Sequence, residues 1–370
     1  MTIFVSAGEP SGDLHAAALV TELARVDPGL RFEGFGGPAL EAAGVKLMER
    51  MEQLTVIGLV ESVAKVPAHY RLLQAMKRRF AAGDVKLVIL VDYPGFHLRV
   101  AAAARAAGLP VLYYIAPTAW AWHESRVRRL RRDVAHLAVI LPFEEEFFRA
   151  RGVAATYVGN PLVDSVRPAA DRGVARRALG MDHDRPVLGL FPGSRAQEIR
   201  RLWPPFREAA ALVRRQRPEV QVVVAAVAAG RYPGAEQVRL VEGRAAECFA
   251  ACDAAICKSG TTTLEAALHG VPQVIAYRLH PLSFAIARAL VRTRWVGLVN
   301  LIAGREVAPE LLQGAARPDA LAESVLPLLA PDSPARRGQL EAIEEVRRLL
   351  GPPGAARRAA QLASSLLGSR

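Results

Sequence analysis

The sequence predicts an α/β fold of two doubly wound parallel sheets, one per domain, which face one another across an interdomain cleft. Three observations predict it. Short apolar runs of strand character alternate along the chain with longer helical patterns, as in βαβ units. The length of 370 residues suits about two domains. A segment rich in Pro, Gly and Asp, residues 159–172, divides the chain into halves that are each long enough for one sheet.

The first half begins with an apolar run that leads through glycines into a helical pattern, and this succession repeats. Its expected strands are Ile3–Ser6, Leu87–Val91, Val111–Ile115 and Leu137–Leu141. Its expected helices are Gly12–Arg25, Arg71–Ala82 and Leu98–Ala107. The apolar runs are continuous rather than alternating, so they predict strands that are covered on both faces.

The second half repeats the pattern with longer helices. Its expected strands are Val187–Phe191, Val220–Ala225, Ala254–Cys257 and Gln273–Tyr277, and its expected helices are Arg195–Arg217 and Thr262–Leu268. We place the first domain at 1–165, the second at 166–345 and a helical tail at 346–370. Gly351-Pro352-Pro353 interrupts the tail, and its last helix, Ala355–Leu367, is expected to pack on the first domain or on a second subunit.

The bulk composition indicates a folded protein with an anionic partner. Hydrophobic residues make up 51% of the chain and charged residues 23%, and the formal net charge is +12. This charge favours nucleic acid, an anionic membrane surface or phosphorylated substrates as partners, although solvated helix faces rich in arginine would give the same excess. No apolar run approaches the roughly 18 residues that a membrane span needs. The first residues lack the features of a signal peptide, so we expect a cytosolic protein.

The cysteines do not predict a metal site. The three cysteines, Cys248, Cys252 and Cys257, lie close together without a CxxC pair or a histidine partner. We therefore expect that they bind no zinc and that they are free thiols in a reducing compartment.

A turn between an apolar run and a helix is the strongest functional signal. Ser259, Gly260 and Thr261 follow the run 254–257, and a helix starts at once. Free N–H groups and the positive end of the helix dipole make such a turn a phosphate site. Glu265, one turn into the helix, is placed to accept hydrogen bonds from a ribose. The segment therefore predicts binding of a nucleoside diphosphate without a metal.

Two other turns of this kind carry polar groups. In the second half, Gly193 and Ser194 precede Arg195, a bidentate phosphate ligand, and Glu198 is expected to cap that helix. Near the N-terminus, the turn contains Gly8, Glu9, Ser11, Gly12 and Asp13. Its glycines permit close approach to a ligand, although packing alone would also explain them.

Asp92 is the candidate catalytic base. It follows the apolar run 87–91, and partial burial at the end of a central strand would raise its pKa into a useful range. The alternative is an ordinary turn or helix cap before Pro94.

Two further segments have compositions that could suit contact with a membrane. The run from Arg126 to Arg132 contains five arginines and no aromatic residue, so it favours anionic lipid headgroups or solvent over a nucleic-acid strand. Residues 54–73 are apolar with scattered cations, as in an element that faces a membrane or acyl chains, or in a core helix.

Together these segments resemble the lipid-A-disaccharide synthase family of inverting glycosyltransferases, which have the GT-B fold of two Rossmann-like domains. The resemblance extends over nearly the whole chain. Its motifs, in family order, are 7–13 (AGEPSGD), 36–38 (GGP), 91–94 (VDYP), 116–122 (APTAWAW), 141–144 (LPFE), 192–195 (PGSR), 259–265 (SGTTTLE), 300–305 (NLIAGR) and 309–313 (PELLQ). The chain departs from the family pattern at Gly95, Ala116, Asn160 and Val299.

The resemblance implies a reaction and a set of site residues. A UDP-2,3-diacylglucosamine donor would give its sugar to the 6-hydroxyl of 2,3-diacylglucosamine 1-phosphate, with inversion and release of UDP. Asp92 would be the base, and the N-terminal turn would lie on the acceptor side. The implied UDP-sugar ligands are Arg195, Ser259, Gly260, Thr261, Glu265 and Asn300. The enzyme would need no cofactor and no metal, would associate peripherally with the cytosolic face of the inner membrane, and could form a homodimer.

Three alternatives remain at this stage. One is a GT-B enzyme that uses a UDP-sugar with another lipid acceptor. Another is an isomerase of the UDP-N-acetylglucosamine 2-epimerase type, which would need acid and base groups around the C2 atom of the sugar. The third is a glycolipid-binding protein without catalysis, in which Asp92→Asn would leave function unchanged.

Overall fold

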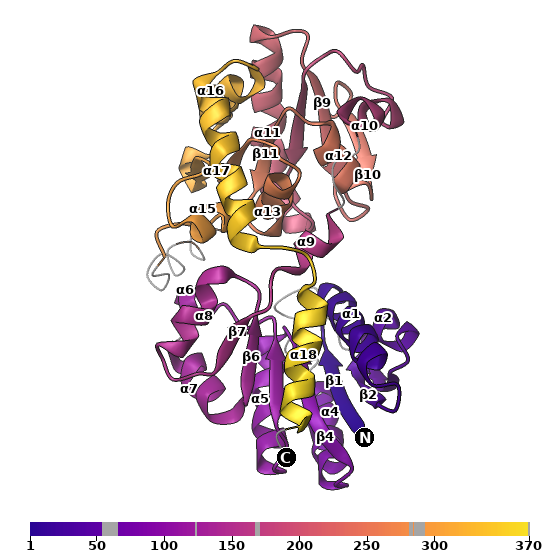
Figure 1. Cartoon of the computed structure of the whole chain (residues 1–370). Coiled ribbons are helices and arrows are strands. Elements are labelled where there is room, and N and C mark those ends of the chain that lie inside the picture. Colours follow the sequence, from indigo (N-terminus) through magenta and orange to yellow (C-terminus); the bar gives the residue numbers. More distant parts are fainter. Residues whose placement is uncertain (54–65, 123, 167–170, 281–283, 285–292, 369–370) are drawn as a thin grey trace. The chain divides into compact units, whose positions relative to one another are not determined.

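The computed structural model describes residues 1–53, 66–122, 124–166, 171–280, 284 and 293–368. The chain divides into two compact units, Met1–Pro161 with Pro352–Arg370 and Leu162–Gly351. Each unit is built on one parallel sheet, of seven strands in the first and six in the second (Figure 1). The predicted α/β class with two parallel sheets is confirmed.

In the first unit the sheet has the order β3-β2-β1-β4-β5-β6-β7. Its strands are β1 (Thr2–Ala7), β2 (Arg31–Gly36), β3 (Lys46–Arg50), β4 (Val85–Val91), β5 (Val111–Tyr114), β6 (His136–Val139) and β7 (Ala155–Tyr157). Its helices are α1 (Pro10–Val26), α2 (Pro38–Ala42), α4 (Val66–Ala81), α5 (Pro94–Ala106), α6 (Ala119–Trp122), α7 (Glu124–Asp133), α8 (Pro142–Arg149) and α18 (Ala355–Gly368), with a 3₁₀ turn at Met51–Gln53.

Helices cover both faces of this sheet, as continuous apolar strands require. Apolar side chains of α4, α5 and α7 pack with Phe4, Leu90 and Tyr113 on one face. Those of α1 and α18 pack with Ile3, Val5 and others on the opposite face. The last helix of the chain therefore belongs to the N-terminal unit, and the Arg358 guanidinium also donates a hydrogen bond to the carbonyl of Val158 at 2.7 Å.

The second unit has the strand order β10-β9-β8-β11-β12-β13. Its strands are β8 (Val187–Phe191), β9 (Gln221–Ala226), β10 (Arg239–Glu242), β11 (Ala254–Lys258), β12 (Gln273–Tyr277) and β13 (Glu310–Leu312). Its helices are α9 (Pro161–Ser165), α10 (Arg172–Ala178), α11 (Ala196–Gln216), α12 (Ala245–Ala251), α13 (Thr261–Leu268), α15 (Leu298–Ala303), α16 (Pro318–Leu329) and α17 (Pro334–Leu350), with a 3₁₀ turn at Gln313–Ala315. Side chains of α11 and α16 cover one face of the sheet, and those of α10 and α12 cover the other.

The predicted strands and helices are all present, with ends displaced by a few residues. The sequence prediction missed β2, β3, β7, β10 and β13. No helix among the described residues is long and apolar enough to cross a membrane. Of the apolar segment 54–73, residues 54–65 lie outside the described residues, and 66–73 belong to α4.

Candidate functional site

The strand order of each sheet reverses direction once, and the predicted site residues gather at these two reversals. In the first unit the reversal lies between β1 and β4, and in the second between β8 and β11. Ligands of doubly wound folds bind beyond the carboxyl ends of the strands at such a point. Gly8–Asp13 lie in the turn after β1 and the first turn of α1, and Asp92 lies in the turn after β4. Arg195 lies in the turn after β8, and 259–261 lie in the turn after β11 and at the start of α13.

Asp92 lies in an unusual turn between β4 and α5. Asp92 and Tyr93 both have left-handed backbone conformations, with φ of 50° and 54°. The Asp92 carboxyl is largely buried, and burial together with the negative charge of Glu9 raises its pKa from 3.8 to about 6. Tyr93, not Asp92, is the N-cap residue of α5. The geometry therefore favours the base over the helix-capping alternative.

The N-terminal turn packs closely against the Asp92 turn. A Cβ on Gly8 would lie 2.3 Å from the Tyr93 ring, and one on Gly12 would lie 3.6 Å from the carbonyl oxygen of Val91. Gly8 is thus needed for space, because the aromatic ring covers its backbone. Ser11 is exposed and Glu9 is half-buried, so both remain candidates for the acceptor side.

Asp13 has a structural role that the sequence prediction did not foresee. Its buried carboxylate accepts hydrogen bonds from the backbone N–H groups of Gly37 (2.7 Å), Ala39 (2.8 Å) and Leu40 (3.3 Å). These are donors at the N-terminus of α2, which the carboxylate caps. Asp13 therefore supports α2, and its place on the acceptor side stays a prediction.

In the second unit, the two predicted phosphate turns differ in whether the backbone N–H groups at the helix N-terminus already have a side-chain partner. At α11, Glu198 accepts hydrogen bonds from the N–H groups of Ser194 (3.3 Å) and Arg195 (3.4 Å), so the predicted cap is confirmed. At α13, Gly260 is the N-cap with a φ of 134°, and no side-chain cap is present. Because Thr261 at this end is exposed, α13 rather than α11 offers free N–H groups to an anion.

Lys258 is a further candidate for the site, and the sequence prediction missed it. It ends β11, and its Nζ lies 3.0 Å from Glu198 Oε1 and 5.9 Å from the centre of the Tyr277 ring. Arg195 lies nearby with its side chain 77% exposed, 3.7 Å from the same carboxylate. A lysine directly before the Ser-Gly turn was the available signal. Glu198 thus joins the two turns and leaves the Arg195 side chain available to a ligand.

Glu265 lies in α13, half-buried, and burial raises its pKa. A carboxyl group within the helix, beyond the phosphate turn, can accept hydrogen bonds from vicinal hydroxyls. Ser259 is buried, and its hydroxyl donates to the carbonyl of Val296 at 2.9 Å, so it supports the segment before α15.

Asn300 is fully buried, and its amide is saturated by the protein. The Nδ2 atom donates to the Ala308 carbonyl (2.8 Å) and to Glu310 Oε1 (2.9 Å). Its Oδ1 accepts from the N–H groups of Val307 (2.7 Å) and Ala308 (2.9 Å). All four hydrogen-bonding positions of the amide are occupied, so Asn300 supports this loop, and its role as a ligand of the donor stays a prediction.

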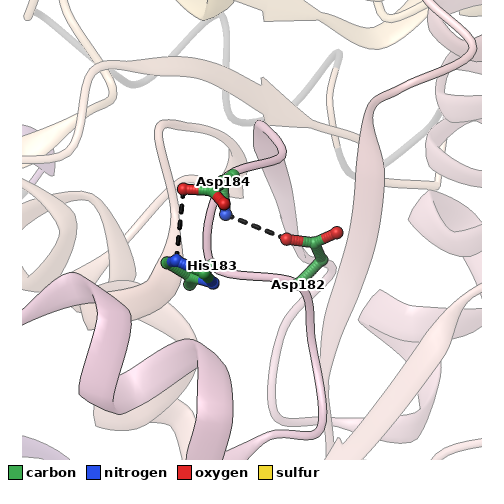
Figure 2. Close-up of side chains that lie close together, drawn as sticks. All are labelled: Asp182, His183 and Asp184. Atoms are coloured by element: carbon green, nitrogen blue, oxygen red, sulfur yellow. Dashed lines mark hydrogen bonds and ion pairs between the residues drawn. The ribbon is translucent and has the colours of Figure 1, made fainter.

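A third cluster of polar groups lies apart from these turns. Asp182, His183 and Asp184 are close enough to share an ion and are all exposed (Figure 2). The Asp182 carboxylate accepts the N–H of Asp184 at 3.0 Å, and His183 Nε2 lies 3.2 Å from Asp184. This is ordinary turn chemistry between α10 and β8, and we assign it no function.

Comparisons with known proteins cover nearly the whole chain. A family model described as lipid-A-disaccharide synthetase matches residues 3–365. The lipid-A-disaccharide synthase of Anaeromyxobacter sp. strain K is 42% identical over 368 residues, which cover 97% of this chain and 96% of that protein. The enzyme of the same name from Myxococcus xanthus strain DK1622 is 43% identical over 374 residues, with 99% and 97% covered.

Solved structures support the fold at low sequence identity. A putative UDP-N-acetylglucosamine 2-epimerase from Listeria monocytogenes gives a TM-score of 0.65 at 14% identity and covers 98% of this chain and 95% of its own. Medicago truncatula UGT71G1, solved with UDP-glucose, gives 0.60 at 14% identity, with 99% and 98% covered.

Proposed function

This chain belongs to the lipid-A-disaccharide synthase family and is a glycosyltransferase of lipid A biosynthesis, and we propose that its two units divide the reaction between them. The unit of residues 162–351 binds the UDP-sugar donor, and the N-terminal unit supplies the base. The observation that carries the proposal is the family match over residues 3–365. The positions of Asp92 and of the open α13 turn at the two sheet reversals support it.

In the proposed reaction, UDP-2,3-diacylglucosamine gives its sugar to the 6-hydroxyl of 2,3-diacylglucosamine 1-phosphate. The Asp92 carboxylate takes the proton of that hydroxyl while its oxygen forms a bond to C1 of the donor sugar. The bond from C1 to the diphosphate breaks, and its electron pair leaves with UDP. Because the pKa of Asp92 is raised to about 6, the group is a carboxylate at neutral pH and still a stronger base than an exposed aspartate.

The leaving diphosphate is stabilised by groups of the second unit. The free N–H groups at Gly260 and Thr261, the dipole of α13 and the cations Lys258 and Arg195 all oppose the charge that develops. Glu265 binds the ribose. These fixed charges supply what a metal ion supplies in other enzymes, so we expect EDTA to leave turnover unchanged. A strict requirement for Mg²⁺ would contradict this assignment.

The acceptor binds to the N-terminal unit. A pocket of about 440 Å³ beside the Asp92 turn is lined by His69, Tyr70, Tyr93 and Phe96, with Arg99 among its lining residues. Apolar walls and one cation suit an acylated sugar phosphate.

Association with the membrane is also part of the proposal. The arginines of α7 are mostly exposed, and Arg128 and Arg131 line one hollow with Arg151. Such a cluster binds anionic headgroups, as expected of an enzyme that acts at the cytosolic face of the inner membrane. Sedimentation with anionic but not zwitterionic vesicles is the expected result. The homodimer stays a prediction, which light scattering checks.

The central experiment is turnover of the purified protein with UDP-diacylglucosamine and the monosaccharide 1-phosphate. Formation of the disaccharide 1-phosphate and UDP is expected, with loss of turnover but retained donor binding in Asp92→Asn. Asp84→Asn is the matched control, because that exposed carboxylate pairs with Arg79 away from the site. Consumption of the donor only with a different acceptor, or full activity of Asp92→Asn, would refute the assignment.

A further inference from the structure

The Asp92 turn has a backbone that is unfavourable without support. Residues with a Cβ rarely adopt positive φ, yet Asp92 and Tyr93 do so in succession, at 50° and 54°. Such conformations persist only where the surrounding structure holds them, and they gather at functional sites. Hydrogen bonds to the carbonyl oxygen of Asp92 hold this backbone conformation.

Two buried side chains donate hydrogen bonds to that single carbonyl oxygen. The Tyr113 hydroxyl donates to it at 2.7 Å. His97 Nδ1 lies 2.7 Å from it, and a carbonyl can only accept, so Nδ1 must carry the proton. Both rings are fully buried. The carbonyl of Asp92 is therefore held from two sides, and with it the direction in which the carboxyl leaves the main chain.

A third residue completes the hydrogen bonding of the His97 ring. The Ser6 hydroxyl lies 2.8 Å from His97 Nε2. Since Nδ1 carries the proton in the neutral ring, Nε2 has a free lone pair and accepts the Ser6 hydroxyl proton. Burial lowers the pKa of His97 to about 4, so the ring is neutral at physiological pH. The chain of donors runs from Ser6 through His97 to the Asp92 carbonyl.

The sheet places these groups on both sides of Asp92. Ser6 of β1 and Tyr113 of β5 are both in register with Leu90 of β4, two residues before Asp92. His97 lies near the start of α5, directly after the turn. Three adjacent strands and one helix thus meet at one carbonyl, at the reversal of strand order between β1 and β4.

We propose that His97, through its Nδ1–H, is a positioning residue that holds the Asp92 turn and so aims the carboxyl at the acceptor hydroxyl. Tyr113 supports the same carbonyl, and the Ser6 hydroxyl holds the other side of the His97 ring at Nε2. The inference rests on the proposed role of Asp92 as the base. His97 touches no substrate and transfers no proton.

Two substitutions of His97 separate this role from simple packing. The amide nitrogen of Asn reaches the position of Nδ1, whereas that of Gln reaches the position of Nε2. His97→Asn therefore keeps the donor to Asp92 and loses the contact with Ser6, and His97→Gln does the reverse. We expect His97→Gln to lose about 10²-fold in kcat, the typical effect of misplacing a reacting group by about 1 Å, and His97→Asn to retain most of it.

The readouts distinguish positioning from stability. Both variants leave one buried group unpaired, so similar losses of thermal stability are expected while kcat differs widely. KM for the UDP-sugar should not move. Tyr113→Phe, which removes the second donor with little change of shape, should also lower kcat. His136→Gln is the matched control, since that half-buried histidine pairs with Thr156 and turnover should not change.

The outcomes are distinct. Equal kcat losses in His97→Asn and His97→Gln, or full activity of His97→Gln, would overturn the inference, as would an Nε2-protonated ring in the ¹⁵N spectrum. Loss of activity in Asp92→Asn with normal kcat in His97→Gln and Tyr113→Phe would reject the positioning role alone. Full activity of Asp92→Asn would instead reject the proposed function.

Discussion

Replacing Asp92 with Asn should make the protein more stable while it removes turnover. The pKa of Asp92 is raised from 3.8 to about 6 by burial and by Glu9, so the folded state binds the proton more tightly than the unfolded state. The ionised carboxylate therefore destabilises the fold at pH values above about 6. That penalty declines as the pH falls through 6, and it is gone below the unfolded value of 3.8.

The magnitude follows from the shift. About two pKa units correspond to roughly 3 kcal/mol at 1.36 kcal/mol per unit, and the partial exposure of the group reduces this to about 1–2 kcal/mol. Asn carries no charge, and it tolerates the left-handed backbone of this turn. Asp92→Asn should thus gain about 1–2 kcal/mol at pH 8 and roughly half of that at pH 5, while kcat falls by about 10²–10⁴-fold.

The measurement is urea unfolding at both pH values, read by amide hydrogen exchange in β4 and β5. This local readout is needed because a chain of two units does not have to unfold in one step. Asp13→Asn is the matched control, and it should lower the stability of the fold where Asp92→Asn raises it. The reason is that an amide cannot accept hydrogen bonds from all three N–H groups that bond to the carboxylate. A variant less stable than the parent at pH 8, or a gain that does not depend on pH, would refute the reasoning.

Three further predictions concern neighbouring groups. Glu9→Gln removes a negative charge that raises the pKa of Asp92, so the acidic limb of the pH profile of kcat/KM should move to lower pH; a limb that stays in place contradicts the coupling. Lys258→Met should lower kcat by roughly 10²-fold, as for other lost donors to a leaving group, and should weaken product inhibition by UDP, whereas the exposed Lys86→Met should do neither. Gly8→Ala should slow turnover, because its Cβ would lie 2.3 Å from the Tyr93 ring; Gly338→Ala, which meets nothing within 4 Å, is the control, and equal activity of the two variants would count against a spatial role for Gly8.

The sequence was sufficient for the central strands and for several of the helices between them, although helices such as α7 and α12 were not predicted. Strands such as β4 and β11 are covered on both faces, so they are continuous apolar runs that can be recognised locally. The missed strands β3, β7, β10 and β13 are all at sheet edges. An edge strand is short and partly exposed, and what defines it is its pairing with a distant neighbour. The strand β2 was not recognised in the sequence because its Arg, Glu and Gly residues interrupt the apolar run.

The same division holds for the candidate site. The strand, turn and helix around Ser259 to Glu265 were predictable, because an apolar run, a small polar turn and a helical pattern follow one another in the sequence. The use of this turn as an anion site stays a prediction. The structural roles of Asp13 and Asn300 were not foreseen. The partners of Asp13, at 37–40, come from another part of the chain, and those of Asn300, at 307–310, lie beyond its own helix. A polar residue at a turn looks the same in sequence whether its partner is a ligand or a remote backbone.

The local sequence thus determined the fold class, the family and the turn that presents free N–H groups to an anion, since each depends on residues that are neighbours in the chain. Only the tertiary structure decided which polar groups are free. It paired Lys258 with Glu198 across two turns and gave Asn300 four internal partners. It also brought Ser6, His97 and Tyr113 to one carbonyl of Asp92. The physical reason is that burial and hydrogen-bond saturation depend on which groups lie in contact in the folded chain, and sequence spacing does not specify those contacts.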